Sequence, residues 1–167
     1  MKSTVITQYW RDYLQTSTLA AAHSQSYLVD QFGDRPELAN ELGQLVLSGT
    51  KTATCSALWE WQAETEPLPT VGTHTIVLNG EGQPLCIIRT TEVTIRAFDV
   101  VDAEFAYDEG EGDRTLAFWR RAHWHYFSRV LPNIGRVPSP DMPLVCERFQ
   151  VVFPVIATSS SREASSN

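Results

Sequence analysis

The chain has 167 residues, of which 43% are hydrophobic, and both values fit one globular domain of ordinary size. No apolar run approaches the roughly 20 residues that a membrane-spanning helix needs, which argues against a membrane protein. The net charge of −7 argues against a protein that holds long DNA duplexes through phosphate contacts alone.

The charges are unevenly distributed along the chain. Residues 99–113 contain seven acids and no base, whereas residues 114–148 contain six arginines and two acids. A local basic face of this kind suits a small anionic ligand or a short single strand of nucleic acid better than a duplex.

The cysteines and the N-terminal sequence indicate the compartment. Cys55, Cys86 and Cys146 lie far apart in apolar surroundings, which is typical of buried free thiols in a reducing environment. Residues 4–14 mix polar and apolar side chains and lack the pattern of a signal peptide. We therefore expect a cytoplasmic protein.

The N-terminal third predicts two helices. Apolar residues at spacings of three and four over residues 5–14 mark an amphipathic helix, and a polar loop follows over residues 15–25. In the second helix Asp34 and Glu37 have the capping-box spacing, and Gly49 supplies a left-handed stop. The first helix either covers the core or supports a homodimer.

The middle of the chain predicts strands. Residues 52–61 begin as a strand and continue as a segment of uncertain type. Strands at residues 74–78 and 85–95, joined by a tight turn at residues 79–82, form a hairpin.

The C-terminal part predicts a short helix at residues 98–107, a longer helix at residues 115–130 and a final strand at residues 145–155. The serine-rich residues 158–167 are expected to form a disordered tail behind a single domain of residues 1–157. Strands of mixed order separated by helices predict an α+β fold whose sheet curls into a small barrel flanked by helices.

The most suggestive segment for chemistry runs from Gly49 to Thr54, with the sequence GTKTAT. A tight turn can bring the Lys51 amine near the Thr54 hydroxyl, and a desolvated amine can take a proton from a hydroxyl nucleophile. The alternative is a solvated lysine that complements the dipole at a helix C-terminus. The segment is not a P-loop, because it leaves a helix rather than opening one.

An acidic loop at residues 107–113 is the second candidate. Glu109 and Glu111 are flanked by glycines, which allow close approach to a ligand, so either carboxylate can serve as an acid or a hydrogen-bond partner. The alternative is a solvated loop. Asp113 is expected to cap the following helix.

No metal site and no cofactor motif are expected. His123 and His125 lie two residues apart on a predicted helix and face different sides, and His123 is expected to be a hydrogen-bonded core histidine. Several tryptophans can either stack on a base or pack in the core; they are Trp59, Trp61, Trp119 and Trp124.

The segment at residues 45–54, LVLSGTKTAT, resembles the signature of the ASCH domain family, a relative of the PUA RNA-binding domains. The resemblance extends over residues 32–153. It includes the acidic loop EGEGD, the pair Trp119 and His123, and the strand sequence CERF at residues 146–149.

The resemblance implies a β-barrel flanked by helices, with a cleft that admits a nucleobase or single-stranded RNA. A short bacterial member of the family is an amidohydrolase that removes the acetyl group of N4-acetylcytidine with a lysine, a threonine and a glutamate. The motif places the lysine at Lys51 and the threonine at Thr54. The glutamate falls on Glu109 or, because the loop is longer in this chain, on Glu111.

Three functions therefore share Lys51. In an amidohydrolase without metal, Thr54 would attack the amide, Lys51 would accept its proton and the glutamate would hold or protonate the leaving cytosine. In the longer family members, which are ribonucleases or RNA binders, the lysine also lies in the cleft. The third alternative is a domain that uses the fold without catalysis. The expected partner is a modified nucleoside or single-stranded RNA.

Overall fold

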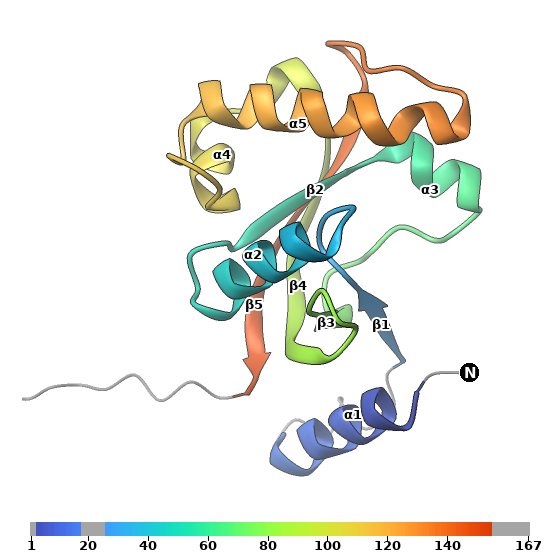
Figure 1. Ribbon diagram of the computed structural model, residues 1–167, viewed down its shortest axis with the longest axis vertical. Coiled ribbons are helices and arrows are strands. Elements are labelled where there is room, and N and C mark those ends of the chain that lie inside the picture. The colour runs from blue at the N-terminus through green and yellow to red at the C-terminus, as the bar shows by residue number, and fades with distance from the viewer. Residues whose placement is uncertain (1–2, 18–25, 155–167) are drawn as a thin grey trace, which may run out of the picture.

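The computed structural model describes residues 3–17 and 26–154. The described elements follow in chain order (Figure 1): α1 (Thr4–Thr16), β1 (Tyr27–Asp30), α2 (Pro36–Leu47), β2 (Ala53–Ala57), α3 (Leu58–Glu64), β3 (His74–Leu78), β4 (Pro84–Ala97), η2 (Phe98–Val100), α4 (Ala103–Glu109), α5 (Leu116–Val130), η3 (Leu131–Ile134) and β5 (Pro143–Phe153). The predicted tail at residues 158–167 lies outside the described residues, and the single domain stays a prediction.

The strands form one mixed sheet in the order β1-β3-β4-β5-β2. β1 pairs with β3 in parallel, and the other neighbours are antiparallel. A register shift between Thr90 and Glu92 interrupts the long β4–β5 ladder, and such a bulge bends a strand. The α+β class is confirmed. Among the described strands, β1 and β2 are the two edge strands, and each is paired on one side only. The curled sheet is therefore open and does not close into a barrel.

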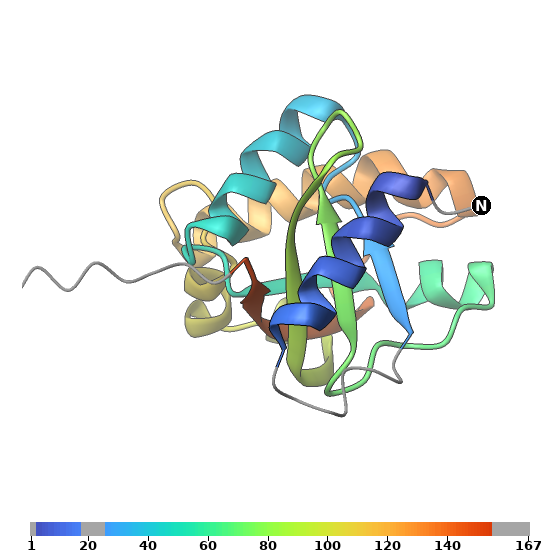
Figure 2. The same ribbon diagram turned by 90° about the horizontal axis from the view of Figure 1, so that it is seen from below.

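Helices cover both faces of the β3–β4 hairpin (Figures 1 and 2). Trp10 and Tyr13 of α1 pack on one face against Ile76 and Ile87. The neighbouring residues of the same strands point the other way, as alternation along a strand requires, and pack against α2; this second cluster includes Val77, Cys86, Leu42 and Val46. The first helix thus covers the core, and a homodimer stays a prediction.

The third part of the core lies between β2, β5 and the helices α4 and α5. It contains large, fully buried side chains such as Phe105, Phe127 and Leu144. Its wall on β2 consists of small residues, Ala53 and Ala57, which let the helices approach the strand closely. No helix in the described ranges is long and apolar enough to cross a membrane.

The start of α2 differs from the prediction. Arg35 is the N-cap and makes no side-chain capping bond, while Pro36 occupies the first turn. Proline fits there because its missing N–H has no partner in the first turn. The expectation that Asp34 caps this helix is therefore wrong: its carboxylate instead accepts hydrogen bonds from Arg129 of α5 at 3.0 and 3.1 Å.

Two other helix starts also differ from the prediction. The helix predicted at residues 98–107 is split into η2 and α4, because Asp102 caps a new helix by accepting from the Phe105 N–H at 2.9 Å. The expectation that Asp113 caps α5 is also wrong. Thr115 is the N-cap, and Asp113 accepts hydrogen bonds from the backbone N–H and the hydroxyl of Thr115 at 2.9 and 2.6 Å.

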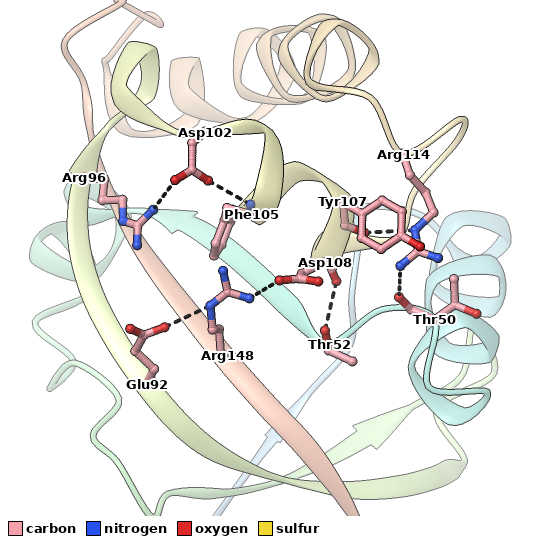
Figure 3. Close-up of polar contacts among 10 residues, drawn as sticks. All are labelled: Thr50, Thr52, Glu92, Arg96, Asp102, Phe105, Tyr107, Asp108, Arg114 and Arg148. Carbon is pink, nitrogen blue, oxygen red and sulfur yellow. Dashed lines mark hydrogen bonds and ion pairs between the residues drawn. The ribbon is translucent and has the colours of Figure 1, made fainter.

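A polar brace ties the loop after α2 to α4 (Figure 3); it consists of Thr50, Thr52, Asp108, Arg114 and Arg148. Arg148 of β5 binds the Asp108 carboxylate and, at 2.9 Å, Glu92. The Thr52 N–H donates to the Asp108 carbonyl at 2.8 Å. Arg114 donates to the Tyr107 carbonyl at 3.0 Å and the Thr50 carbonyl at 3.4 Å. The brace fixes the acidic loop relative to residues 49–54.

We expect Arg148→Met to lower the free energy of unfolding by about 2 kcal/mol, because it leaves the partly buried Asp108 carboxylate without its cation. Urea denaturation measures this change. Arg11→Met is the matched control, since Arg11 is exposed on α1 and makes no ion pair within the described residues, and it should change stability by less than about 0.5 kcal/mol. Equal effects of the two substitutions would contradict the role of the brace.

Candidate active site

A cavity of about 410 Å³ lies where the sheet is open. The end of β1, strand β2, the first half of α2 and one side of α5 surround it. Its volume falls within the range of about 300–1,000 Å³ that is typical of small-molecule sites. Aromatic side chains line its wall, as is common in small-molecule sites; they are Phe32, Trp61, Phe118 and Tyr126.

Lys51 is buried in the wall of this cavity, with only 2% of the residue exposed. Gly49 ends α2 with a φ of 79°, and the N–H groups of Thr50 and Lys51 both donate to the Leu45 carbonyl, which turns the chain inward. The Lys51 Nζ donates to the Glu109 carbonyl at 3.3 Å and lies 3.8 Å from Glu111 Oε1. Lys51 is therefore not a solvated lysine at a helix end.

Glu111 faces the cavity. Its side chain is 19% exposed, and its carboxylate lies 3.8 Å from both the Lys51 Nζ and the His123 Nε2. Gly110 makes this possible, because it has a φ of 72° and a Cβ there would lie 2.5 Å from the Thr50 carbonyl oxygen. The loop can pack against residues 50–51 only with glycine at this position.

Glu109 lies behind the wall, with no exposed surface. Its Oε2 accepts from the Trp119 Nε1–H at 2.8 Å and lies 2.7 Å from the His123 Nε2. The other oxygen, Oε1, has no hydrogen-bond partner by distance and angle within the described residues. The two glutamates of the acidic loop thus occupy different places, since Glu111 borders the cavity and Glu109 supports it from inside.

The hydrogen bonds of His123 determine its protonation. The Nδ1 lies 2.9 Å from the Trp119 carbonyl, which can only accept, so Nδ1 carries a proton. The Nε2 lies against the Glu109 carboxylate, whose pKa is held well below its usual range, so Nε2 also carries a proton. Burial opposes this charge, but the Glu109 carboxylate, through its charge and its hydrogen bond, raises the pKa of His123.

The same pair lowers the pKa of Glu109. Burial alone raises it, but the charges of His123 and Lys51 and the hydrogen bond from His123 outweigh burial and hold the pKa well below its usual range. His123 is hydrogen-bonded, as expected, but it is only partly buried and also lines the cavity, and the pair is an imidazolium with a carboxylate.

Cys55, Glu109 and His123 are the described residues whose arrangement comes nearest to a metal site, with ligand atoms within 4.8 Å of one another. Burial together with the charge of Glu109 raises the pKa of the Cys55 thiol well above its usual value. A metal ion that bound here would have to displace the protons of Cys55 and His123.

Thr54 also lines the cavity, from β2. Its hydroxyl makes no hydrogen bond with Lys51, Glu109 or Glu111 within the described part of the chain. The structure thus brings Lys51, Thr54 and Glu111 to one cavity, leaves the Thr54 hydroxyl free for a ligand and places Glu109 behind them.

Glu147 is a cavity residue that the sequence analysis did not select. It lies on β5 directly opposite Thr54 of β2. Burial, and to a lesser extent the nearby Asp30, raise the pKa of Glu147 to about 7, against the effect of a hydrogen bond from Thr90. A charged residue at the same face of β5 as the buried Phe149 is the signal that points to it.

Glu109→Gln should lower the free energy of unfolding by about 3 kcal/mol, because His123 and Lys51 lose a buried counter-charge. The pKa of Glu109 is lower in the folded protein, so Glu109 stabilises the fold above its unfolded-state pKa and loses this contribution as the pH falls. The pKa of His123 is higher in the folded protein, so His123 stabilises the fold below its unfolded-state pKa and loses this contribution as the pH rises. The difference from wild type should therefore be largest between about pH 4.5 and 6.5.

Urea denaturation of both proteins across this pH range tests the prediction, with the exposed Glu66→Gln as the matched control. A difference that does not change with pH would contradict the ion pair.

Comparison with known proteins places the chain in a family. A family model described as the ASCH domain matches residues 28–153. The crystal structure of an ASCH domain from Lactobacillus crispatus JV V101 shares 34% identity and a TM-score of 0.85, and the alignment covers 90% of this chain and 95% of that one. A protein from Enterococcus faecalis V583 shares 41% identity and a TM-score of 0.80, over 87% of this chain and 86% of that one.

A search of curated proteins gives no match. The family match nevertheless covers the sheet from the second residue of β1 onward, together with its cavity, and it confirms the resemblance drawn from the motif at residues 45–54. The chain belongs to the ASCH domain family.

Proposed function

We propose that the protein is an amidohydrolase that removes an acyl group from the N4 nitrogen of a cytidine-type nucleoside. One observation carries the proposal: an amine, a free hydroxyl and a carboxylate, from Lys51, Thr54 and Glu111, border one cavity of about 410 Å³. These are the groups that acyl transfer through a hydroxyl nucleophile requires.

In this scheme Lys51 first passes a proton to Glu111, so that its amine is uncharged. The Thr54 oxygen then attacks the acyl carbon, and its proton moves to the Lys51 amine. The bond between the acyl carbon and N4 breaks, and N4 takes this proton from Lys51 to leave as the free amine of cytidine. Water hydrolyses the acyl group on Thr54 and releases the carboxylic acid. Glu111 lies 3.8 Å from the Lys51 Nζ and can exchange protons with it.

The position of the two glutamates supports a division of roles. Glu111 touches the cavity, so we assign it the contact with the leaving base. Glu109 has no exposed surface, so we assign it a positioning role through its bonds to His123 and Trp119 and through the carbonyl that holds Lys51.

Lys51→Met and Thr54→Val should each lower kcat for N4-acetylcytidine by at least about 10²-fold, because one removes the base and the other the nucleophile. Thr54→Ser should retain a measurable rate, since it keeps the hydroxyl. Release of cytidine, followed by mass spectrometry, measures these rates.

Glu66→Gln is the control for a change of charge outside the cavity and should leave the rate unchanged. Absence of cytidine release by the wild-type protein, or equal rates in wild type and Thr54→Val, would contradict the proposal.

A second candidate function, binding or cleavage of single-stranded RNA, has one specific observation in its favour. A second recess of about 420 Å³ lies along α5; its lining includes Arg120, Arg121, Trp124 and Ser128. His125 borders both this recess and the first cavity. A nucleotide next to a base in the first cavity would meet two arginines and an indole ring here, the groups that bind phosphate and stack on bases.

If RNA is the ligand, a short single strand binds with a strong dependence on salt. The double substitution Arg120→Gln and Arg121→Gln then makes the affinity less sensitive to salt. The slope of log affinity against log salt concentration becomes shallower by about 0.7 for each phosphate that an arginine no longer neutralises. Gel shifts of a labelled single strand at several salt concentrations measure this slope. Arg11→Gln with Arg136→Gln, at exposed arginines outside both cavities, is the matched control. No retention of RNA at low salt would exclude this function.

A further inference from the structure

Glu147 occupies a defined place on the cavity wall. It pairs with Thr54 across the antiparallel β2–β5 ladder, so the two side chains project to the same face and both border the cavity. A ligand whose acyl carbon lies at the Thr54 hydroxyl is therefore within the reach of the Glu147 carboxyl group.

The partners of Glu147 differ from those of Glu111. Glu111 lies beside two cations, Lys51 and His123. Within the described residues no ion pair reaches Glu147; the hydrogen bond to its carboxyl group comes from the Thr90 hydroxyl, which donates to Oε1 at 3.4 Å. Thr90 is itself buried, and its hydroxyl uses one of the two lone pairs of Oε1, so both Oε1 and Oε2 can contact a ligand.

This setting makes the neutral form of the carboxyl group accessible near neutral pH. Glu147 is half-buried, and burial together with the nearby Asp30 raises its pKa to about 7. With Oε1 accepting from Thr90, the proton of the neutral acid resides on Oε2. The group then presents one acceptor and one donor side by side.

We infer that Glu147 recognises the base: its Oε2–H donates to an unprotonated ring nitrogen while its Oε1 accepts from the adjacent N–H group of the same base. Cytosine-type bases carry this edge, with N3 as the acceptor and N4–H as the donor. Uracil in the same orientation places a donor at N3 and an acceptor at position 4, which leaves both groups unpaired. The inference rests on the proposed function, because it names the base that occupies the same cavity.

Calorimetric titration of cytidine tests this recognition without turnover. Wild type should bind cytidine at least about tenfold more tightly than 3-deazacytidine, which lacks the N3 acceptor, and than uridine, a difference that corresponds to the removal of one hydrogen bond. This comparison needs no variant and so does not depend on the folding of one.

Two substitutions of Glu147 distinguish recognition by a neutral acid from a role that depends on a negative charge. Glu147→Gln keeps one donor and one acceptor and should bind cytidine within about threefold of wild type, whereas Glu147→Ala should bind cytidine about tenfold more weakly and no longer distinguish it from 3-deazacytidine. Glu66→Gln is the control. Urea denaturation of each variant checks that it is folded.

The inference is overturned if wild type does not bind cytidine, if it binds both nucleosides equally, or if Glu147→Gln weakens binding as much as Glu147→Ala. Failure of the proposed function gives a different result: selective cytidine binding with no release of cytidine from N4-acetylcytidine. Release of cytidine that is unaffected by Glu147→Ala overturns the inference alone.

Discussion

The ion pair between the buried Glu109 and the partly buried His123 is the interaction on which the site depends. It stacks His123 on Trp119, with ring centroids 4.3 Å apart, and it sets the end of α4 against the middle of α5. The backbone of Glu109 then offers its carbonyl to Lys51, and the next turn of chain places Glu111 at the cavity. A charge pair out of water is costly unless further hydrogen bonds support it, and here Trp119 donates to the carboxylate and accepts from the imidazolium.

The open side of the sheet provides the space that this arrangement uses. A closed barrel of this size fills its interior with side chains, whereas an open edge between β1 and β2 leaves room for a ligand. Lys51 and Thr54 lie three residues apart in one segment, and at this edge they meet Glu147 of β5, which is far from them in sequence. The brace between Arg148 and Asp108 lies on the side of β2 that faces away from Glu147, and it keeps the acidic loop beside the strand.

The sequence predicts the long elements and the motif well, because each carries its own local signal. The helix at residues 116–130 has an apolar face, the β3–β4 hairpin has a tight turn, and Gly49 has the positive φ that its position as a helix stop requires. Features set by tertiary contacts escape prediction. β1 is four residues long and is held by β3, and Asp34 leaves its expected cap to bind an arginine 95 residues away.

The proposed reaction requires that Thr54 carries the acyl group as an intermediate. Rapid quenching of wild type with N4-acetylcytidine, followed by mass spectrometry of the peptide that contains residues 51–54, measures this directly. We expect one added acetyl group on the Thr54 oxygen, which disappears as cytidine release is completed and is absent from Thr54→Val. Release of cytidine with no acetylated Thr54, at the same rate in Thr54→Val, would contradict it.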